Sequence, residues 1–438
     1  MARPAAEIPG RVAYLDARLV DPATGLDGRG GLLTDGEEIA AIGADVTADS
    51  VGSDARTIDC GGAVLAPGLV DIRAELGEPG EEYKETFATA GRAATAGGVT
   101  SVLCLPGTEP VIDDMSVVEF VARRARLLGL TKVYPYAAIT KGLEGKEIAE
   151  LQMLSEAGAV AFTDGIRAIN DAQVMLRALL YAATFDLLLV QHPEEPSLAA
   201  GGVMNAGETA TRLGLEGIPA AAEVIMVERD IRLVETAGGR LHFAHISTAQ
   251  TVEAIRQAKA RGLAVTCDTA PPYFALNETA IGDYRTFAKL RPPLRTEADR
   301  QAIVEGLVDG TIDCIASDHR PQDEEAKRLP FTQAASGGIG LETLLAITLE
   351  LHHNGHLSLL GALALVTQRP ADLMGLKAGR LEVGRPADLV LFEPATGWKI
   401  IREELSSKSK NSPFDERPVQ GKVKRTVIDG RTVYEAGD

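Results

Sequence analysis

Two kinds of hydrophobic pattern divide the chain. Short segments in which apolar and polar residues alternate, separated by Gly and Asp turns, occupy residues 11 to 66 and return at 387–392 and 424–431. This alternation is typical of small antiparallel strands. The two β-rich flanks can pair only if the long segment between them folds as a unit that brings its ends together. We therefore predict one small β-sandwich domain, built from residues 1–66 and 377–438.

Between these flanks, apolar runs rich in β-branched residues alternate with longer helical patterns. Most of the runs lack alternation, so both of their faces should be buried, as in a parallel sheet covered by helices. The runs lie at 64–72, 99–105, 133–139, 159–162, 187–191, 241–244, 264–267 and 311–316. Eight such strands predict an α/β protein with a (β/α)₈ TIM-like barrel over residues 67–376. A doubly wound open sheet is the alternative, but no G-x-G-x-x-G follows the first strand.

Composition narrows the classes of function. The 438 residues include 62 acidic and 44 basic side chains, a formal net charge of −18, so neither nucleic acid nor an anionic membrane is an expected partner. The four cysteines show no C-x-x-C spacing, which argues against a zinc knuckle or a disulfide scaffold. The sequence shows no signal-peptide pattern and no long apolar run, so we expect a soluble, cytoplasmic protein. We expect no nucleotide cofactor. The polar stretch 406–412 is predicted to be a mobile surface loop.

In a barrel of this kind, functional side chains lie just after the carboxyl end of each strand. Asp164, His192 and His245 occupy such positions and form a candidate ligand set for a single zinc ion. Nitrogen and oxygen donors suit zinc, and three protein ligands plus water make a catalytic type of site. Asp318 follows the last strand and is the candidate general base. Glu75 follows the first strand and could add a further carboxylate ligand.

Several segments carry a resemblance to a known family. They read APGLVDI at 66–72, AGGVT at 96–100, AHIST at 244–248, PPLR at 292–295 and GRPADL at 384–389. In this order and over nearly the whole chain, the sequence resembles the dihydroorotase family. The resemblance implies the amidohydrolase barrel with a flanking β-domain, and a place in pyrimidine biosynthesis.

The chain departs from the family pattern where the family binds metal and substrate. The family's first strand ends in a His-x-His pair followed by an arginine for the substrate carboxylate, and these positions hold Arg73, Glu75 and Gly77. A substrate-binding asparagine is replaced by Gly107, and another, before PPLR, by Arg291. The family's DHAPH signature reads DHRPQ at 318–322, so that its last histidine becomes Gln322.

Arg73 changes what this site is expected to do. A guanidinium is permanently protonated, cannot ligate a cation and would repel one, but it can form an ion pair with Asp318 or Asp164. The remaining donors support at most one metal ion. We therefore favour a catalytically inactive, dihydroorotase-like subunit, and its resemblance to such homologues implies a structural role in the assembly of aspartate transcarbamoylase, in a homo- or hetero-oligomer.

The alternative is an active cyclic amide hydrolase with one zinc ion, acting on dihydroorotate or on a dihydropyrimidine or hydantoin-like ring. It would use Asp164, His192 and His245 as ligands and Asp318 as the base. The orientation of Arg73 discriminates between the two functions. An active site keeps that side chain turned away from the metal, whereas an inactive site lets it fill the centre.

Overall fold

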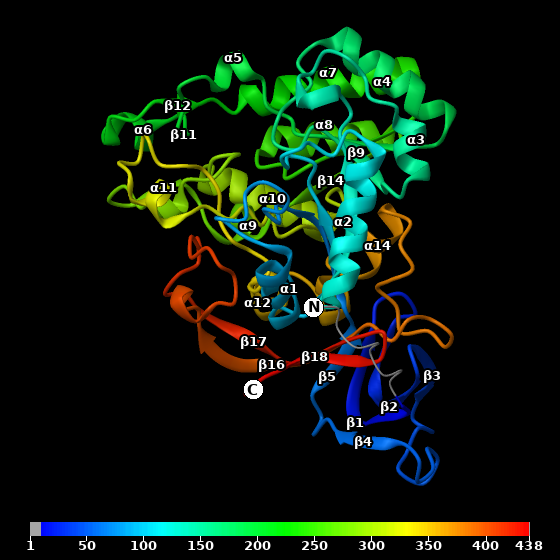
Figure 1. Ribbon diagram of the computed structural model, residues 1–438. Coiled ribbons are helices and arrows are strands. Elements are labelled where there is room, and N and C mark those ends of the chain that lie inside the picture. The colour runs from blue at the N-terminus through cyan, green and yellow to red at the C-terminus, as the bar shows by residue number, and fades with distance from the viewer. Residues whose placement is uncertain (1–9, 438) are drawn as a thin grey trace.

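The computed structural model describes residues 10–437, in which eight parallel strands form a nearly closed barrel (Figure 1). Ala74, at the end of the first barrel strand, forms a parallel bridge with His319, which follows the last one, so these two strands lie next to each other. The predicted α/β barrel is confirmed. Its strands, in spatial order, are β6 (Leu69–Ala74), β7 (Val99–Cys104), β8 (Lys132–Ala137), β9 (Ala161–Thr163), β10 (Leu188–Gln191), β13 (Arg240–Phe243), β14 (Val265–Thr269) and β15 (Cys314–Ile315).

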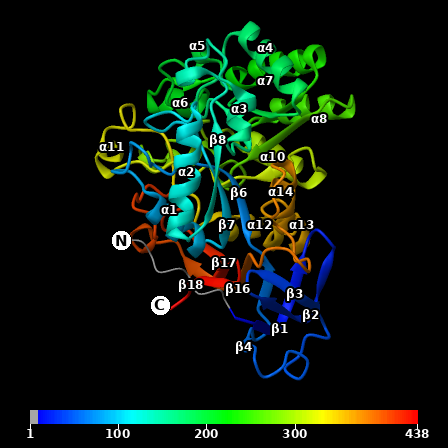
Figure 2. The same cartoon turned by 45° about the vertical axis from the view of Figure 1, so that its right-hand side comes forward.

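Helices cover the outside of the barrel, as the view in Figure 2 shows. Several begin at the capping residues that the sequence supplies, such as Asp114 before α2, Asp171 before α4 and a Thr296–Asp299 capping box at α10. No helix among residues 10–437 is both long enough and apolar enough to span a membrane. The main helices are α1 (Phe87–Ala96), α2 (Met115–Leu128), α3 (Leu151–Glu156), α4 (Ala172–Thr184), α7 (Ala221–Ala237), α8 (Ala249–Ala260), α10 (Glu297–Asp309), α12 (Leu344–His353), α13 (Leu359–Ala364) and α14 (Gln368–Leu373).

Shorter elements lie in the loops at the carboxyl ends of the strands. The segment after β10 contains a two-stranded parallel pair, β11 (Met204–Asn205) with β12 (Gly217–Ile218). The remaining short helices are α5 (Pro196–Ala199), α6 (Glu208–Leu213), α9 (Pro271–Ala275) and α11 (Glu324–Arg328), with 3₁₀ turns η1 (Lys141–Leu143), η2 (Glu278–Ile281), η3 (Thr286–Ala288) and η4 (Arg402–Glu404).

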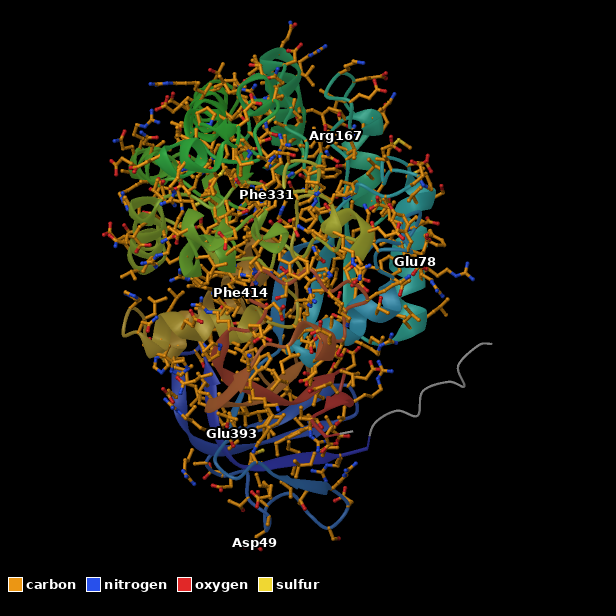
Figure 3. The ribbon with its side chains drawn as sticks, turned by 90° about the vertical axis from the view of Figure 1, so that its left-hand side faces the viewer. Asp49, Glu78, Arg167, Phe331, Glu393 and Phe414 are labelled. Atoms are coloured by element: carbon orange, nitrogen blue, oxygen red, sulfur yellow. The ribbon has the colours of Figure 1, made fainter. Side chains whose placement is uncertain are left out.

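Strands from both ends of the chain share one sheet, as the flank pattern predicts. In Figure 1 the blue N-terminal and red C-terminal strands lie side by side, and Figure 3 shows Glu393 of β16 at this end of the molecule. The join is the antiparallel pair β5–β16, in which Val64 to Pro67 face Leu389 to Phe392. The small β-domain is thus built on one continuous sheet. Its strands are β1 (Val12–Asp21), β2 (Leu26–Asp35), β3 (Glu38–Gly43), β4 (Arg56–Asp59), β5 (Val64–Pro67), β16 (Leu389–Lys399), β17 (Pro418–Ile428) and β18 (Arg431–Glu435).

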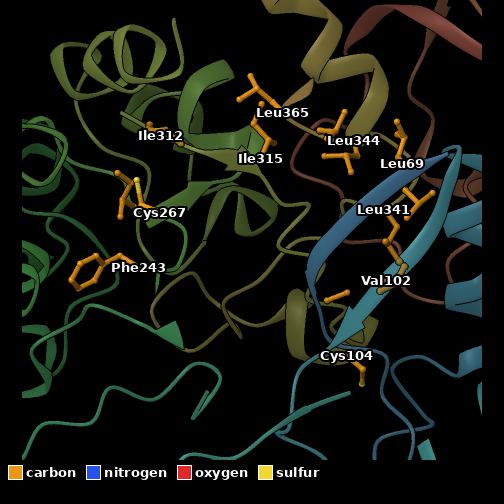
Figure 4. Close-up of a cluster of buried hydrophobic side chains, with 14 of the residues drawn as sticks. Leu69, Val102, Cys104, Phe243, Cys267, Ile312, Ile315, Leu341, Leu344 and Leu365 are labelled. Carbon is orange, nitrogen blue, oxygen red and sulfur yellow. The ribbon is translucent and has the colours of Figure 1, made fainter. Parts of the chain in front are cut away.

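The largest hydrophobic core lies between the barrel strands and the surrounding helices. Figure 4 shows part of it, in which Leu69 and Val102 on neighbouring strands belong to the same buried cluster as Leu344 of α12. Every residue of β6 and β7 is buried, which explains why these runs show no polar alternation.

Two local predictions differ from the structure. Residues 64–72 were expected to form one strand, but they form β5 in the terminal sheet and β6 in the barrel, with Gly68 between them. A Cβ atom at Gly68 would lie 2.2 Å from the Thr100 side chain, so the chain turns there at a point of close contact. The stretch 406–412 is largely buried rather than a surface loop. Its side chains bind barrel loops: Ser409 donates to the carbonyl of Lys84 and Asn411 to that of Gly337.

Candidate functional site

Arg73 fills the carboxyl end of the barrel. It lies near the end of β6, and only 2% of its side chain is exposed. Its Nε donates a hydrogen bond of 2.9 Å to Oδ1 of Asp318, and a terminal nitrogen donates one of 3.2 Å to the carbonyl of Gly165. The guanidinium therefore points inward, and the predicted ion pair with Asp318 is formed.

Asp318 is held between two cationic or polar neighbours. Nδ1 of His245 lies 3.1 Å from the same oxygen that Arg73 contacts. Burial by itself would raise the pKa of Asp318, but His245 and Arg73 lower it well below its usual range. Asp318 and His245 both have positive φ angles, 48° and 41°, which is uncommon for residues other than glycine. The carboxylate is thus ionised and already paired.

The two histidines of the predicted ligand set bind each other. Nδ1 of His192 lies 2.7 Å from Nε2 of His245, a hydrogen bond in which one ring donates to the other. Burial lowers the pKa of His192 to about 4, so this ring is neutral near pH 7. Its other nitrogen, Nε2, has no hydrogen-bond partner among residues 10–437 and faces Glu194 at 3.9 Å.

The two predicted carboxylate ligands turn away from the histidines. Asp164 accepts hydrogen bonds from the backbone N–H groups of Ile139 and Thr140, at 3.0 and 2.9 Å, and from the Thr140 hydroxyl. Burial raises its pKa. Glu75 lies 3.2 Å from Nε of Arg320 instead. Both oxygens of Asp164 are therefore engaged, and Glu75 belongs to a separate ion pair.

The donors at this site do not fit the predicted zinc ion. Asp318 is paired with Arg73, Asp164 is bound to the β8 loop, and the nitrogens of His192 and His245 that face each other share a hydrogen bond. Within residues 10–437, no three or more His, Cys, Asp or Glu side chains are grouped so that they could hold a metal ion. The structure brings together His192, His245 and Asp318, but it does not assemble the predicted ligand set.

Three acidic residues at the site were not identified from the sequence. Glu194 accepts a hydrogen bond of 2.7 Å from Arg291. Burial by itself would raise the pKa of Glu194, but His192 and Arg291 lower it to about 2. Asp71 is fully buried against Ser317, and burial raises its pKa to about 6. Asp268 accepts from the backbone N–H of His245. Asp268 follows an apolar run, so the strand-end rule could have found it, whereas Asp71 lies within its strand.

A cavity of about 780 Å³ opens beside this centre. Of the positions that depart from the family pattern, Arg291 and Gln322 line it, whereas Gly77 and Gly107 do not. Gly77 has φ 71°, and a Cβ there would lie 2.4 Å from the carbonyl of Glu85, so the turn requires glycine. Figure 3 labels Arg167, another lining residue, toward the end of the molecule opposite the terminal sheet.

Comparisons with known proteins agree with this architecture. The chain is 45% identical over 428 residues to the dihydroorotase of Syntrophotalea carbinolica, covering 98% of this chain and 100% of that one. It is 45% identical to the dihydroorotase of Anaplasma phagocytophilum, over 97% of this chain and 95% of the other. The L-hydantoinase (dihydropyrimidinase) of Arthrobacter aurescens has the same fold, with a TM-score of 0.86 and 26% identity over 98% of this chain and 96% of that one.

The barrel and its flanking sheet place the protein among the amidohydrolases. Residues 62–251 match the family model described as Dihydro-orotase-like. Together with the relatives above, this match shows that the chain belongs to the dihydroorotase family. The family predicted from the sequence is confirmed, while the comparisons neither test an association with aspartate transcarbamoylase nor support loss of activity.

Proposed function

We propose that this chain is a cytoplasmic protein of pyrimidine biosynthesis that no longer hydrolyses or closes a ring, and that it acts as a structural subunit for aspartate transcarbamoylase. Membership of the dihydroorotase family supports the pathway. The buried Arg73–Asp318 ion pair is the observation that carries the loss of activity.

Ring hydrolysis by a metal-dependent amidohydrolase needs an activated water, a polarised carbonyl and a base. Asp318, the residue suited to be the base, has its pKa lowered and is engaged by Arg73 and His245, so it is a poor proton acceptor. The donors described above do not form a metal site that would activate a water. The side chains in place therefore supply neither a free base nor a metal site that would activate a water.

The barrel itself remains intact although this centre is altered. Its strands, helices and buried core are complete over residues 10–437, and the loops at the barrel mouth are tied together by buried polar side chains. A protein that serves as a subunit needs this framework but not the chemistry. The resemblance to non-catalytic dihydroorotase-like subunits supports the transcarbamoylase as the partner.

Co-expression with the aspartate transcarbamoylase of the same organism tests the structural role. We expect one large complex that contains both chains when the proteins are separated by size at micromolar concentration. As a control, Arg73→Met/Asp318→Asn, which removes both buried charges, should leave the complex unchanged when circular dichroism shows the variant to be folded, because this role uses neither side chain. Two separate peaks would contradict the proposal.

The second candidate is an active cyclic amide hydrolase, and the comparisons favour it over the first, because the relatives at 45% identity carry the name dihydroorotase. The cavity lined by Glu194 and Arg291, next to His192, is also large enough for a ring substrate. This function requires the Arg73 side chain to leave the centre so that metal can bind there.

A cyclisation assay with N-carbamoyl-L-aspartate separates the two functions. With zinc supplied, we expect no turnover above that of buffer, because Arg73 holds the base and excludes a cation. Turnover by the wild-type protein that disappears in Asp318→Ala would establish the hydrolase and overturn the structural role as the sole function.

A further inference from the structure

The cavity beside the barrel centre is rich in positive charge, although the chain as a whole carries a formal charge of −18. Five cationic side chains line it, against the two carboxylates of Glu144 and Glu194. The cavity lining therefore has an excess of cations, although the protein as a whole has an excess of acidic residues. The cationic residues are Lys84, Lys146, Arg167, Arg291 and Arg320.

Two further lysines, Lys289 and Lys327, are buried and lie close enough to the lining residues Arg291 and Arg320 to be affected by their charge. Nζ of Lys289 donates to the carbonyls of Phe331 and Thr332, and Nζ of Lys327 donates to that of Thr286, at 2.7, 3.0 and 2.9 Å. Neither lysine has a carboxylate partner within residues 10–437. A buried cation without a counter-ion is costly, and an anion in the cavity would offset that cost.

Cavity residues and buried lysines influence each other electrostatically. Burial, reinforced by the charges of Arg320 and Lys289, lowers the pKa of Lys327 to about 7. Burial also lowers the pKa of Lys289, with Arg291 contributing. These shifts indicate that the positive charge of the two buried lysines is not compensated by a carboxylate and adds to that of the neighbouring arginines.

The departures from the family pattern build this charge. Arg320 stands where the DHAPH signature has alanine, and Arg291 stands where the family has asparagine before PPLR. Both lie in the cavity lining, together with Gln322, which replaces the last histidine of the signature. Two of these three changes add a guanidinium to the same cavity.

We infer that the cavity binds a small phosphorylated metabolite that carries at least two negative charges. Arg167, Arg291 and Arg320 come from three different segments, after β9, before α10 and after β15, so they can reach an anion from several sides. A guanidinium fork matches phosphate oxygens, and a diphosphate offers more acceptors than a single carboxylate can. A volume of about 780 Å³ lies in the range of small-molecule sites.

The internal partners of these cations explain why the ligand must carry high charge. Arg291 is held by Glu194, Arg320 by Glu75, Lys146 by Glu144 and Lys84 by Glu81. Arg167 donates to the carbonyl of Leu143 and has no carboxylate partner within residues 10–437. A ligand with a single negative charge would only replace one of these carboxylates, with little gain in binding free energy. A group with two or more charges can engage several cations at once. The inference goes beyond the proposed structural role and holds whether or not the centre is catalytic.

Calorimetric titration of the full chain with inorganic pyrophosphate tests the inference. We expect saturable binding that weakens roughly tenfold in Arg291→Asn and roughly a hundredfold in Arg291→Asn/Arg320→Ala, because each change removes a charge-assisted contact. Arg328→Gln is the matched control: it removes an arginine of α11 whose side chain is 72% exposed and outside the cavity, so affinity should not change.

Further outcomes decide the chemical class. Succinate is a dianion, so it meets the charge requirement of the inference, but it carries no phosphate. It should bind at least about tenfold more weakly than pyrophosphate. Equal affinity for succinate would overturn the phosphate assignment. Absence of saturable binding, or equal binding by the wild-type protein and a double variant that circular dichroism shows to be folded, would overturn the site itself. Arg291→Asn alone alters a partly exposed side chain and keeps the test valid if the double variant does not fold.

Discussion

Replacing Arg73 with methionine is expected to destabilise the protein by about 3–5 kcal/mol at pH 7, because it leaves the charge of Asp318 buried without its guanidinium partner. Methionine has a similar length and keeps most of the apolar contacts of the side chain. The guanidinium, by contrast, makes hydrogen bonds to both Asp318 and the carbonyl of Gly165, and both are lost. Urea unfolding monitored by circular dichroism measures the effect.

A matched control is available on the surface. Arg29 forms an ion pair of 2.7 Å with Asp16, and its side chain is 76% exposed. We expect Arg29→Met to cost no more than about 1 kcal/mol, because water screens the exposed pair. The double variant Arg73→Met/Asp318→Asn should recover part of the loss, since neither charge then remains. A loss in Arg73→Met as small as in Arg29→Met would show that the buried pair is not what stabilises the centre.

The effect of Arg73→Met should also depend on pH. In the wild-type protein the pKa of Asp318 is lowered on folding, so its contribution to stability is present above the pKa of the unfolded chain, about 4, and is lost as the pH falls further. In the variant, burial opposes His245 alone, so the pKa of Asp318 is higher and protonation relieves the buried charge. The loss of stability caused by the substitution should therefore be smaller near pH 4 than at pH 7.

The fold was largely predictable because it follows from burial. Runs such as 99–105 are apolar on both faces only when helices cover both sides of a parallel sheet, and the structure has β7 there with every residue buried. The pairing of the two β-rich flanks also follows from the sequence, because a closed barrel brings together the two ends of the segment that forms it. Polar burial was not predictable in this way. The stretch 406–412 looks like a surface loop, yet its side chains bind Glu85, Lys84 and Gly337.

At the site, position along the strands was predictable but side-chain direction was not. Residues 192, 245 and 318 follow strand ends at one rim of the barrel, and the structure brings them together. Asp164 also follows a strand, but its carboxylate turns toward the N–H groups of Ile139 and Thr140. No periodicity in the sequence encodes this choice, because it depends on which unpaired backbone donors lie nearby in the fold. Charge predicted that Arg73 pairs with Asp318 or Asp164, and the structure selects Asp318 because Asp164 is already bound to the N–H groups of Ile139 and Thr140.

Restoring the family's histidines is expected to create metal binding that the wild-type chain lacks. Position 73 lies in β6 and position 75 directly follows its end, and residues two apart in extended backbone project to the same side. A histidine at 75, which would lack the ion pair that draws Glu75 to Arg320, can therefore turn toward the centre. In Arg73→His/Glu75→His the guanidinium that repels a cation is removed, Asp318 is released, and two imidazoles are added. Histidine nitrogens and a carboxylate are ligands that zinc prefers.

The measurement is the zinc content after dialysis against a weak chelator, determined by elemental analysis. We expect about one equivalent in the double variant, at an affinity at least about a hundredfold higher than that of the wild-type protein, which should retain well below one equivalent. Glu75→His alone is the control: it adds one ligand but keeps the guanidinium of Arg73 beside Asp318, so it should stay nearly metal-free. Stoichiometric zinc in the wild-type protein would mean that Arg73 swings out of the centre, and the active hydrolase would then be the better account of this chain.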